Sequence, residues 1–415
     1  VEEAQTQKSP TQQTVEKFER IFVPGVLTLT GLVIVVPPLF GVPFQQSFLR
    51  AMTLLVAASP CALALGTPAS ILAGVAQAAR HGVLIKGGVH LENLGRLKAI
   101  AFDKTGTITH GRPEVTQVVP LAPGRTADEL LALTAAIESR SGHPLAQAVV
   151  RAAQAKSLAM PPIGEVESLT GRGLRSTLND RPVLIGSLKL MDESGVPVSA
   201  AARDQIDDLQ GGGHTIMAVS VGGGLVGVLA LADTLRADAI QAMVALRQAG
   251  IQQTVMLTGD NQRVAAAIAA KVGLSSFRAD LMPEDKVTTI RSLRDTLGAV
   301  AMVGDGVNDA PALANATVGI AMGGAGTDVA LETADVALMS DDLSKLPFAI
   351  GLGRATRNII TQNLVIALGV IAVLVIASLT GWAGIGVAIL FHEGSTIVVV
   401  LNALRLLGYQ PAPVR

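Results

Sequence analysis

Three short apolar segments in the middle of the chain end in carboxylates, hydroxyls and glycines. Leu97–Phe102 leads into Asp103-Lys104-Thr105-Gly106-Thr107, Gln253–Leu257 into Thr258-Gly259-Asp260, and Ala299–Val303 into Gly304-Asp305-Gly306-Val307-Asn308-Asp309. Because α/β sheets bind ligands at the carboxyl ends of their strands, we expect the three segments to meet at one site. A single Asp-Gly turn carries little weight. Three strand ends of this kind, with Lys286 between the last two, predict a phosphoryl-transfer centre.

The charges in these segments suit that chemistry. We expect Asp103 to act as a carboxylate nucleophile. Asp305, the Thr105 carbonyl, phosphate oxygens and Asp103 itself would hold Mg²⁺, which prefers hard oxygen ligands. Thr258 and Lys286 would neutralise the equatorial phosphoryl oxygens during transfer. The full predicted catalytic set is Asp103, Lys104, Thr105, Thr258, Gly259, Asp260, Lys286, Asn308 and Asp309, the last two orienting their loop.

These motifs resemble those of the P-type ATPases, whose phosphorylation domain has a haloacid-dehalogenase fold. Asp233-Thr234-Leu235-Arg236 is similar to the family's Asp-x-x-Arg element. The resemblance implies an ATP hydrolase that uses ATP and Mg²⁺ and forms an aspartyl phosphate on Asp103. The P-loop NTPase signature, Gly-x-x-x-x-Gly-Lys-Ser/Thr, does not occur in the sequence.

A membrane-anchored phosphatase of the same fold is an alternative from another class. Phosphatases of the haloacid-dehalogenase type usually carry a second Asp two residues after the nucleophile, as general acid/base. Here that position is Thr105. Without a proton carrier beside it the aspartyl phosphate should hydrolyse slowly, which favours a transport cycle.

Residues 113–230 interrupt the phosphorylation core and predict a separate α+β domain. Thr126–Ile137 and Pro144–Ala155 have helical spacing, and Leu174–Ile185 indicates a hairpin around Asn179-Asp180. In metal-pumping P-type ATPases this insert binds ATP through a Glu, a Ser-Glu-His-Pro motif and a Gly-x-Gly motif. Gly142 departs from the usual Glu of the second motif. The resemblance implies that the cofactor-binding residues are Glu138, His143, Gly171 and Gly173, together with Asp233.

The apolar residues gather at the two ends of the chain. Hydrophobic residues make up 49% of the 415, charged residues only 16%, and the formal net charge is −1. This balance argues against a nucleic-acid partner, and the single cysteine, Cys61, excludes an intrachain disulfide. Since a bilayer core about 30 Å thick needs roughly 20 residues per helix, we predict spans at 21–38, 51–79, 357–380 and 384–407. Lys and Arg residues at their inner ends place the 81–346 region in the cytoplasm, on the plasma (inner) membrane.

Two polar clusters interrupt the predicted spans. Ser59-Pro60-Cys61 lies mid-membrane, where Pro60 cannot donate a hydrogen bond to the Val56 carbonyl. Taken alone, this cluster is equally consistent with a packing kink and an ion site. His392-Glu393-Gly394-Ser395-Thr396 places a carboxylate inside a span, which is costly and functional by default. One thiolate, one imidazole, one carboxylate and hydroxyls suit Zn²⁺ or Co²⁺ better than Cu⁺.

This pair of clusters resembles the cobalt/zinc subgroup of the heavy-metal P-type ATPases. Asn363 and Asn402 are expected to form interhelical hydrogen bonds instead of binding the ion. The predicted function is ATP-driven export of Co²⁺ or Zn²⁺. The alternatives are a pump for Cd²⁺, Fe²⁺, Ni²⁺ or Cu⁺, the phosphatase, and a regulatory or structural remnant. By the resemblance, the ligands of the transported ion are Ser59, Cys61, His392, Glu393 and Thr396.

The expected architecture is a membrane α-helical bundle plus an α/β haloacid-dehalogenase-like phosphorylation domain with an inserted α+β nucleotide-binding domain. A pump of this family also needs an actuator domain with a Thr-Gly-Glu loop, and no Thr-Gly-Glu occurs in the sequence. We therefore expect the C-terminal portion of a longer pump, partnered by an N-terminal actuator domain and further membrane helices. The predicted parts are a linker (1–20), two transmembrane helices (21–89), the phosphorylation domain (90–112 and 231–346), the nucleotide-binding domain (113–230) and two more transmembrane helices (347–415).

Overall fold

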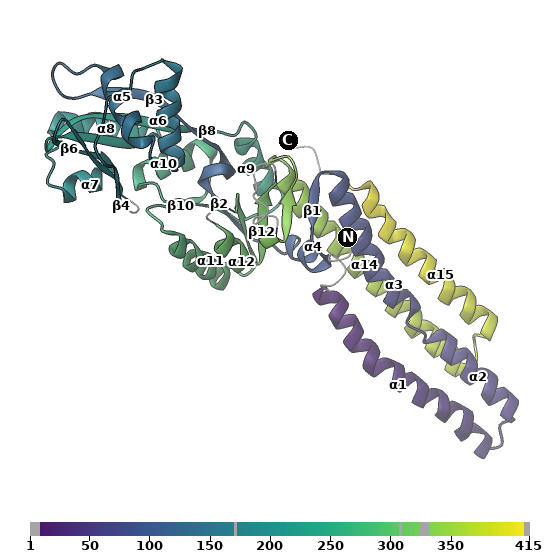
Figure 1. Ribbon diagram of the computed structural model, residues 1–415. Coiled ribbons are helices and arrows are strands. Elements are labelled where there is room, and N and C mark those ends of the chain that lie inside the picture. Colours follow the sequence, from purple (N-terminus) through teal and green to yellow (C-terminus); the bar gives the residue numbers. More distant parts are fainter. Residues whose placement is uncertain (1–8, 170–171, 307–308, 324–331, 411–415) are drawn as a thin grey trace.

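A long helical bundle and two α/β bodies make up the protein (Figure 1). The computed structural model describes residues 9–169, 172–306, 309–323 and 332–410. One α/β body is built on a mostly parallel sheet, and the other is an antiparallel sheet inserted into it. The predicted fold class is therefore confirmed.

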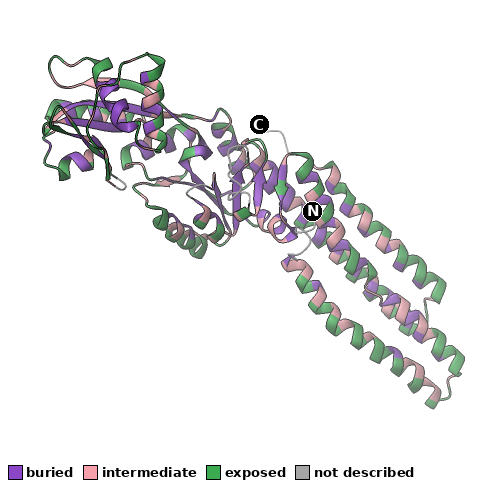
Figure 2. Cartoon of the chain, viewed as in Figure 1, coloured by how far each residue is buried: buried purple, intermediate pink, exposed green. Residues whose placement is uncertain are grey.

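Four segments of the described chain are long and apolar enough to cross a membrane, which makes this a multi-pass membrane protein. Their outward faces are largely exposed, as helices that face lipid require (Figure 2). All four predicted spans are found. The segments are Pro10–Leu39 (α1), Phe44–Arg80 (α2, Phe44–Ala57, with α3, Cys61–Arg80), Lys345–Thr380 (α14) and Ile385–Gly408 (α15, Ile385–Leu404, with the 3-10 turn Arg405–Gly408).

Helix α1 begins at Pro10, well before the span expected from residue 21. The Ser9 hydroxyl accepts a hydrogen bond from the Gln12 N–H at 3.1 Å, and a proline is well suited to the first helical position. Thr11 donates from its backbone N–H and its hydroxyl to Glu92, at 3.3 and 2.7 Å. Glu92 is only 1% exposed and lies on α4 (Gly88–Leu94). A tertiary contact thus fixes the start of α1.

The second membrane segment is interrupted where the sequence predicts it. Helix α2 ends at Ala57 and α3 begins at Cys61. Because Pro60 has no N–H, the Val56 carbonyl accepts a hydrogen bond from the Ser59 N–H instead, at 3.2 Å. The predicted opening of the helix is confirmed.

The first α/β body, which the sequence predicts to be the phosphorylation domain, is a seven-stranded sheet in the order β1-β13-β12-β11-β2-β9-β10. All neighbouring pairs are parallel except β1 and β13. Its central strands are fully buried because helices pack on both faces, which explains their continuous apolar runs. The strands are β1 (Val83–Ile85), β2 (Ala99–Asp103), β9 (Gln253–Leu257), β10 (Ser276–Arg278), β11 (Val300–Gly304), β12 (Val318–Met322) and β13 (Val336–Leu338).

The two faces of this sheet belong to separate hydrophobic clusters. One face packs on α9 (Ala239–Gln248) and α10 (Gln262–Val272), in a cluster that continues into the inner ends of α3 and α14. The other packs on α11 (Pro283–Leu297) and α12 (Ala310–Asn315). Strand β1 follows α3 in sequence and β13 precedes α14, so the β1–β13 pair joins the sheet to the membrane helices.

The inserted body is a six-stranded antiparallel sheet in the order β3-β8-β7-β6-β5-β4. The predicted hairpin is present, and positive φ angles of 49° and 61° at Asn179 and Asp180 form its turn. The chain enters the insert through β3 and leaves it through β8, which pair as one long ribbon. The strands are β3 (Thr109–Pro120), β4 (Glu167–Leu169), β5 (Gly173–Leu178), β6 (Arg181–Gly186), β7 (Thr215–Val221) and β8 (Gly224–Leu235), with helices α5 (Ala127–Glu138), α6 (Pro144–Ala155), α7 (Leu188–Glu193) and α8 (Ala200–Gly211).

Candidate active site and ion path

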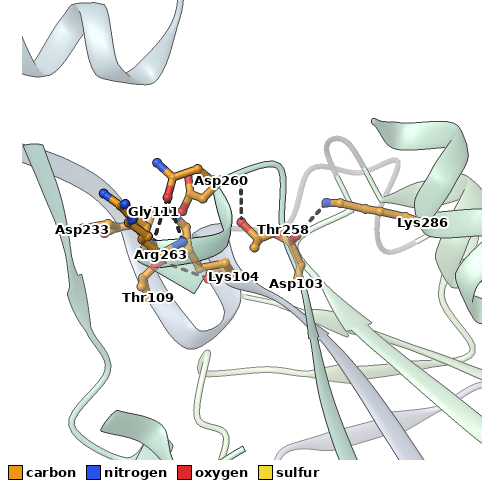
Figure 3. Close-up of polar contacts among 11 residues, drawn as sticks. Asp103, Lys104, Thr109, Gly111, Asp233, Thr258, Asp260, Arg263 and Lys286 are labelled. Atoms are coloured by element: carbon orange, nitrogen blue, oxygen red, sulfur yellow. Dashed lines mark hydrogen bonds and ion pairs between the residues drawn. The ribbon is translucent and has the colours of Figure 1, made fainter. Parts of the chain in front are cut away.

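The three predicted strand ends meet at one edge of the phosphorylation sheet. Strand β2 pairs in parallel with β9 on one side and with β11 on the other. Asp103 stands opposite Leu257, so Thr258 follows directly beside it. Figure 3 shows Asp103, Thr258 and Lys286 around the same point.

Lys286 is shared between two buried carboxylates. Its ammonium donates to Asp103 Oδ1 and to Asp309 Oδ1, both at 2.6 Å. Asp103 is 6% exposed and Asp309 only 1%. Burial raises the pKa of Asp103 to about 7, helped by the Asp309 charge and opposed by Lys286. Burial alone would lower the pKa of Lys286, but the two carboxylates outweigh it and raise that pKa.

The loops around Asp103 are tied to one another. The hydroxyl oxygen of the buried Thr258 accepts from the Asp260 N–H at 3.1 Å, which leaves its own hydrogen available to a phosphoryl oxygen. Lys104 forms an ion pair with Asp260 and thereby links the nucleophile loop to the turn that contains Gly259. Thr105, two residues after Asp103, is exposed. Asn308 lies outside the described residues.

The oxygen atoms beside Asp103 suit Mg²⁺. Gly106 has φ +74°, and a Cβ placed on it would come within 2.7 Å of Asp305 Oδ2, so the Asp305 carboxylate lies against the nucleophile loop. The Asp305 charge also raises the pKa of Asp103, as expected of a carboxylate close by. Within the described ranges no three or more His, Cys, Asp or Glu residues are grouped to hold a metal. Two carboxylates and the Thr105 carbonyl, completed by phosphate oxygens, form a hard set suited to this ion.

Asp233 joins the start of β3 to β8 through its carboxylate. Its carboxylate accepts from the Thr109 hydroxyl at 2.5 Å, from the Gly111 N–H at 3.0 Å and from the Arg112 N–H at 3.1 Å. These groups belong to the register shift between β3 and β8, where strand pairing leaves N–H groups without partners. Its predicted contact with the cofactor stays a prediction.

The sequence prediction did not include Arg236 in the site. Its guanidinium donates to the Gly106 carbonyl at 3.0 Å and to the Asp341 carbonyl at 2.9 Å, and the residue is 8% exposed. Arg236 therefore fixes the backbone of the nucleophile loop. The signal was present in the sequence, because Arg236 is the last residue of the Asp-x-x-Arg element.

The predicted nucleotide residues lie on two helix ends and one strand of the insert. Glu138 ends α5 and is 5% exposed, and burial raises its pKa to about 7. His143 caps α6 by accepting from the Leu145 N–H at Nδ1, which leaves Nε2–H as an outward donor. Partial burial lowers the pKa of His143, so the ring is neutral at pH 7. Gly171 lies outside the described residues.

In the membrane, the structure buries one part of the predicted ion site and exposes another. His392 and Ser395 are 5% and 8% exposed, whereas Glu393 is exposed, with its Oε1 4.0 Å from His392 Nε2. The Ser395 and Thr396 hydroxyls donate to the His392 carbonyl, at 2.7 and 3.2 Å.

Cys61 is exposed, and its Sγ lies 3.1 Å from the Ser59 hydroxyl. Helices α3 and α15 pack where Val399 Cγ1 would meet a Cβ on Gly66 at 2.7 Å. In both helices the residues before this contact lie farther from the phosphorylation domain, because both chains run toward that domain. At 1.5 Å per residue, Cys61 lies about 7.5 Å and His392 about 10.5 Å before that contact. The two residues are at similar depth on neighbouring helices, although the described residues do not bring three ligands together.

The two asparagines form the predicted interhelical bonds. Asn363 on α14 donates to the Ser70 hydroxyl of α3 at 3.3 Å. Asn402 on α15 donates to Asn363 Oδ1 at 2.9 Å. One chain of hydrogen bonds therefore joins α3, α14 and α15 between the interruption at Pro60 and the phosphorylation domain.

A family model of haloacid dehalogenase-like hydrolases matches residues 97–317, more than half of the chain. The protein belongs to this family. The match covers strands β2, β9, β10 and β11 of the parallel sheet, the carboxylates at the carboxyl ends of β2, β9 and β11, and the whole antiparallel insert.

Over nearly its whole length, this haloacid dehalogenase-like chain is similar to P-type ATPases that transport heavy metals. It is 45% identical to a cadmium-transporting ATPase of Staphylococcus aureus over 411 residues, which cover 98% of the chain and 56% of that protein. It is 46% identical to the zinc/cadmium/lead-transporting P-type ATPase of Escherichia coli (strain K12), over 98% of the chain and 54% of that protein. The crystal structure of a zinc-transporting PIB-type ATPase in the E2.Pi state is similar with a TM-score of 0.75, at 46% identity, covering 98% of the chain and 66% of that structure. The chain thus spans about half the length of its curated relatives.

The raised pKa of Asp103 predicts a stability change that depends on pH. A carboxyl whose folded pKa, about 7, exceeds its ordinary 3.8 destabilises the native state when it ionises. This cost is complete above pH 7 and disappears below about pH 4. Without Mg²⁺, Asp103→Asn should raise the unfolding temperature by about 2–4 °C or more at pH 8 and by less at pH 5.5. Differential scanning calorimetry would measure this; Asp295→Asn, on the exposed face of α11, is the control and should change nothing. A lower unfolding temperature for Asp103→Asn at pH 8 would contradict the burial argument.

Gly173 is required by the strand pairing itself. Its φ is +151°, and an added Cβ would stand 2.0 Å from the Ile185 carbonyl oxygen, whereas Gly142 has nothing within 4 Å. Gly173→Ala should destabilise the insert by about 1–3 kcal/mol, and Gly142→Ala should stay within about 0.5 kcal/mol. Thermal unfolding of the two variants tests the contrast. Equal stability would show that β5 can shift to admit a side chain.

Proposed function

We propose that the protein is the phosphorylation and ion-binding part of an ATP-driven exporter of a divalent transition metal. The observation that carries the proposal is the buried Asp103, paired with Lys286 at the junction of three strands, in a sheet that continues directly into membrane helices. The membrane-anchored phosphatase is disfavoured because Thr105 stands where such enzymes carry their general acid/base.

Asp103 is the nucleophile of the proposed reaction. One of its carboxylate oxygens attacks the γ-phosphorus of ATP, the bond from that phosphorus to the bridging oxygen of ADP breaks, and ADP leaves with the electron pair. Lys286 holds the carboxylate in place at 2.6 Å and counters the charge of the incoming phosphate. Thr258 donates its free hydroxyl hydrogen to an equatorial oxygen. Water later attacks the phosphorus of the aspartyl phosphate, the bond from phosphorus to the Asp103 oxygen breaks, and inorganic phosphate leaves as the carboxylate is restored.

Mg²⁺ would be held by Asp103, Asp305 and the Thr105 carbonyl, and when bound it supplies positive charge to the phosphoryl oxygens. The nucleotide would bind to the insert, with neutral His143 donating from Nε2 at the start of α6. Glu138, whose pKa burial raises to about 7, would face it from the end of α5. Gly171 and Gly173 would let the nucleotide approach the backbone. The β3–β8 ribbon, closed by Asp233, connects this nucleotide site to Asp103.

The transported ion would bind at the interruption between α2 and α3. Cys61 supplies a thiolate, His392 an imidazole and Glu393 a carboxylate, with the Ser59 and Thr396 hydroxyls completing the set. Thiolate and imidazole together favour Zn²⁺ or Co²⁺, while Cu⁺ prefers several sulfur ligands. The relatives are named for cadmium, zinc and lead. We propose Zn²⁺ or Co²⁺ for this protein on the grounds of its ligand types.

Labelling with radioactive ATP tests the nucleophile. The protein should acquire acid-stable phosphate that hydroxylamine releases, as an acyl phosphate requires. Asp103→Asn should abolish the label, because an amide is not a nucleophile toward phosphorus. Asp260→Asn makes the same change from carboxylate to carboxamide at a neighbouring position and should reduce labelling without eliminating it. Labelling that persists in Asp103→Asn would remove the pump function.

The lifetime of the phosphoenzyme should depend on Thr105. A carboxyl at this position would supply the missing proton carrier, so Thr105→Asp should speed dephosphorylation by about 10²-fold. Thr105→Asn has the same size and no titratable group, and it should keep the slow decay. A chase with unlabelled ATP measures both rates. Equal decay in the two variants would show that proton transfer does not limit hydrolysis.

The choice of metal can be tested on the full-length protein. Zn²⁺ and Co²⁺ should stimulate ATP hydrolysis more than Cu⁺, and Cys61→Ser or His392→Ala should reduce this stimulation about tenfold or more. Phosphorylation of Asp103 from inorganic phosphate should remain in both variants, because it does not require the transported ion. Equal stimulation by Cu⁺ would defeat the assignment of a borderline divalent ion.

A further inference from the structure

A groove lies between α14 and α15 at the end of the bundle nearest the phosphorylation domain. Its volume is about 510 Å³, within the usual range for small-molecule sites. The polar residues Thr361, Gln362, Asn402 and Arg405 line one end of the groove, and Val365 and Val398 are among its apolar residues. It is thus polar toward the inner membrane surface and apolar toward the bilayer centre.

The polar end is organised around a single charge. Arg405 follows α15 and is exposed, and it donates to Asn402 Oδ1 at 2.9 Å. The amide nitrogen of Asn402 donates in turn to Asn363 Oδ1 at 2.9 Å and to Gln362 Oε1 at 3.2 Å. Asn402 therefore has fixed partners on both its oxygen and its nitrogen, and it orients the guanidinium. In the part of the chain that the structure describes, Arg405 has no carboxylate partner within ion-pair distance.

We propose that this groove binds an anionic phospholipid of the inner leaflet. The phosphate of the headgroup would accept hydrogen bonds from the remaining N–H groups of Arg405, which suit phosphate geometry. One acyl chain would lie along Val365 and Val398, which are 67% and 51% exposed and face the hydrocarbon. A positive charge at one end of the groove and an apolar surface along the rest match a phospholipid, which has both a phosphate and an acyl chain. A free anion has no apolar part to contact the two valines.

Bound lipid would act on the ion path through the asparagines. Asn402 contacts Asn363, and Asn363 donates to Ser70, whose hydroxyl donates to the Gly66 carbonyl at 2.7 Å. Gly66 lies on α3 shortly after Cys61. A headgroup that holds Arg405 thus stabilises the packing of the helix that begins at the interruption.

Native mass spectrometry of the purified full-length protein tests the site. Phosphatidylglycerol and phosphatidylcholine are titrated separately, and the first bound lipid should be retained more tightly for phosphatidylglycerol. Arg405→Gln should weaken that affinity about tenfold relative to Arg357→Gln. Arg357 is the matched control because it is an exposed cation of α14 near the same surface that does not line the groove.

A second variant keeps the charge and fills the groove. Val365→Trp should weaken binding about fivefold or more, because the ring occupies the space of the acyl chain. Equal losses in Arg405→Gln and Arg357→Gln would overturn the proposal in favour of diffuse attraction. So would equal affinity for the two lipids, or displacement of the lipid by inorganic phosphate alone. The absence of any retained lipid, as when another segment covers the groove, would overturn it as well.

Discussion

One ammonium group shared by two buried carboxylates is the constraint on which the phosphorylation domain depends. Asp103 and Asp309 end up within reach of Lys286 because β2 and β11 are adjacent parallel strands and α11 crosses above them. Two such carboxylates without a cation would repel each other in a site of low polarity. With it, and with Asp103 ionised, the cluster carries a net charge of about −1, which Mg²⁺ can balance. The fold thus leaves a negative charge at this site that a bound cation can neutralise.

The same sheet is built into the membrane bundle. Strand β1 extends from α3 and pairs with β13, which leads into α14, so the helix with the Pro60 interruption and its neighbour are joined through backbone hydrogen bonds. The hydrophobic cluster on that face of the sheet includes residues from the inner ends of both helices. A structural change that follows a change of charge at Asp103 can therefore be transmitted to the membrane helices through packed, hydrogen-bonded structure without a flexible connection.

The sequence was sufficient for those features that depend on chain-local patterns. Apolar runs that lead into Asp103, Thr258 and Asp305 revealed the strands and their shared edge, because the carboxyl ends of parallel strands lie at the same edge of a sheet. Long stretches without charge revealed the four spans, and Pro60 revealed the interruption.

What the sequence could not supply depended on tertiary contacts. Helix α1 starts early because Glu92, distant in sequence, accepts hydrogen bonds from its first turn. Asp233 has the appearance of a ligand in the motif, yet its hydrogen bonds depend on how β3 and β8 pair. Helical phase gives the face on which Cys61 and Glu393 lie, but not which neighbour covers that face, and both are exposed in this structure.

The β3–β8 ribbon has a mechanical consequence for catalysis. The chain enters and leaves the insert through these two paired strands. At the register shift beside Thr109, the Asp233 carboxylate accepts hydrogen bonds in place of cross-strand partners. A paired ribbon resists shear along its strands but bends across its plane, most easily where the pairing is broken. We therefore expect the insert to turn relative to the parallel sheet at this register shift, and under the proposed function such a turn would bring a nucleotide bound to the insert toward Asp103.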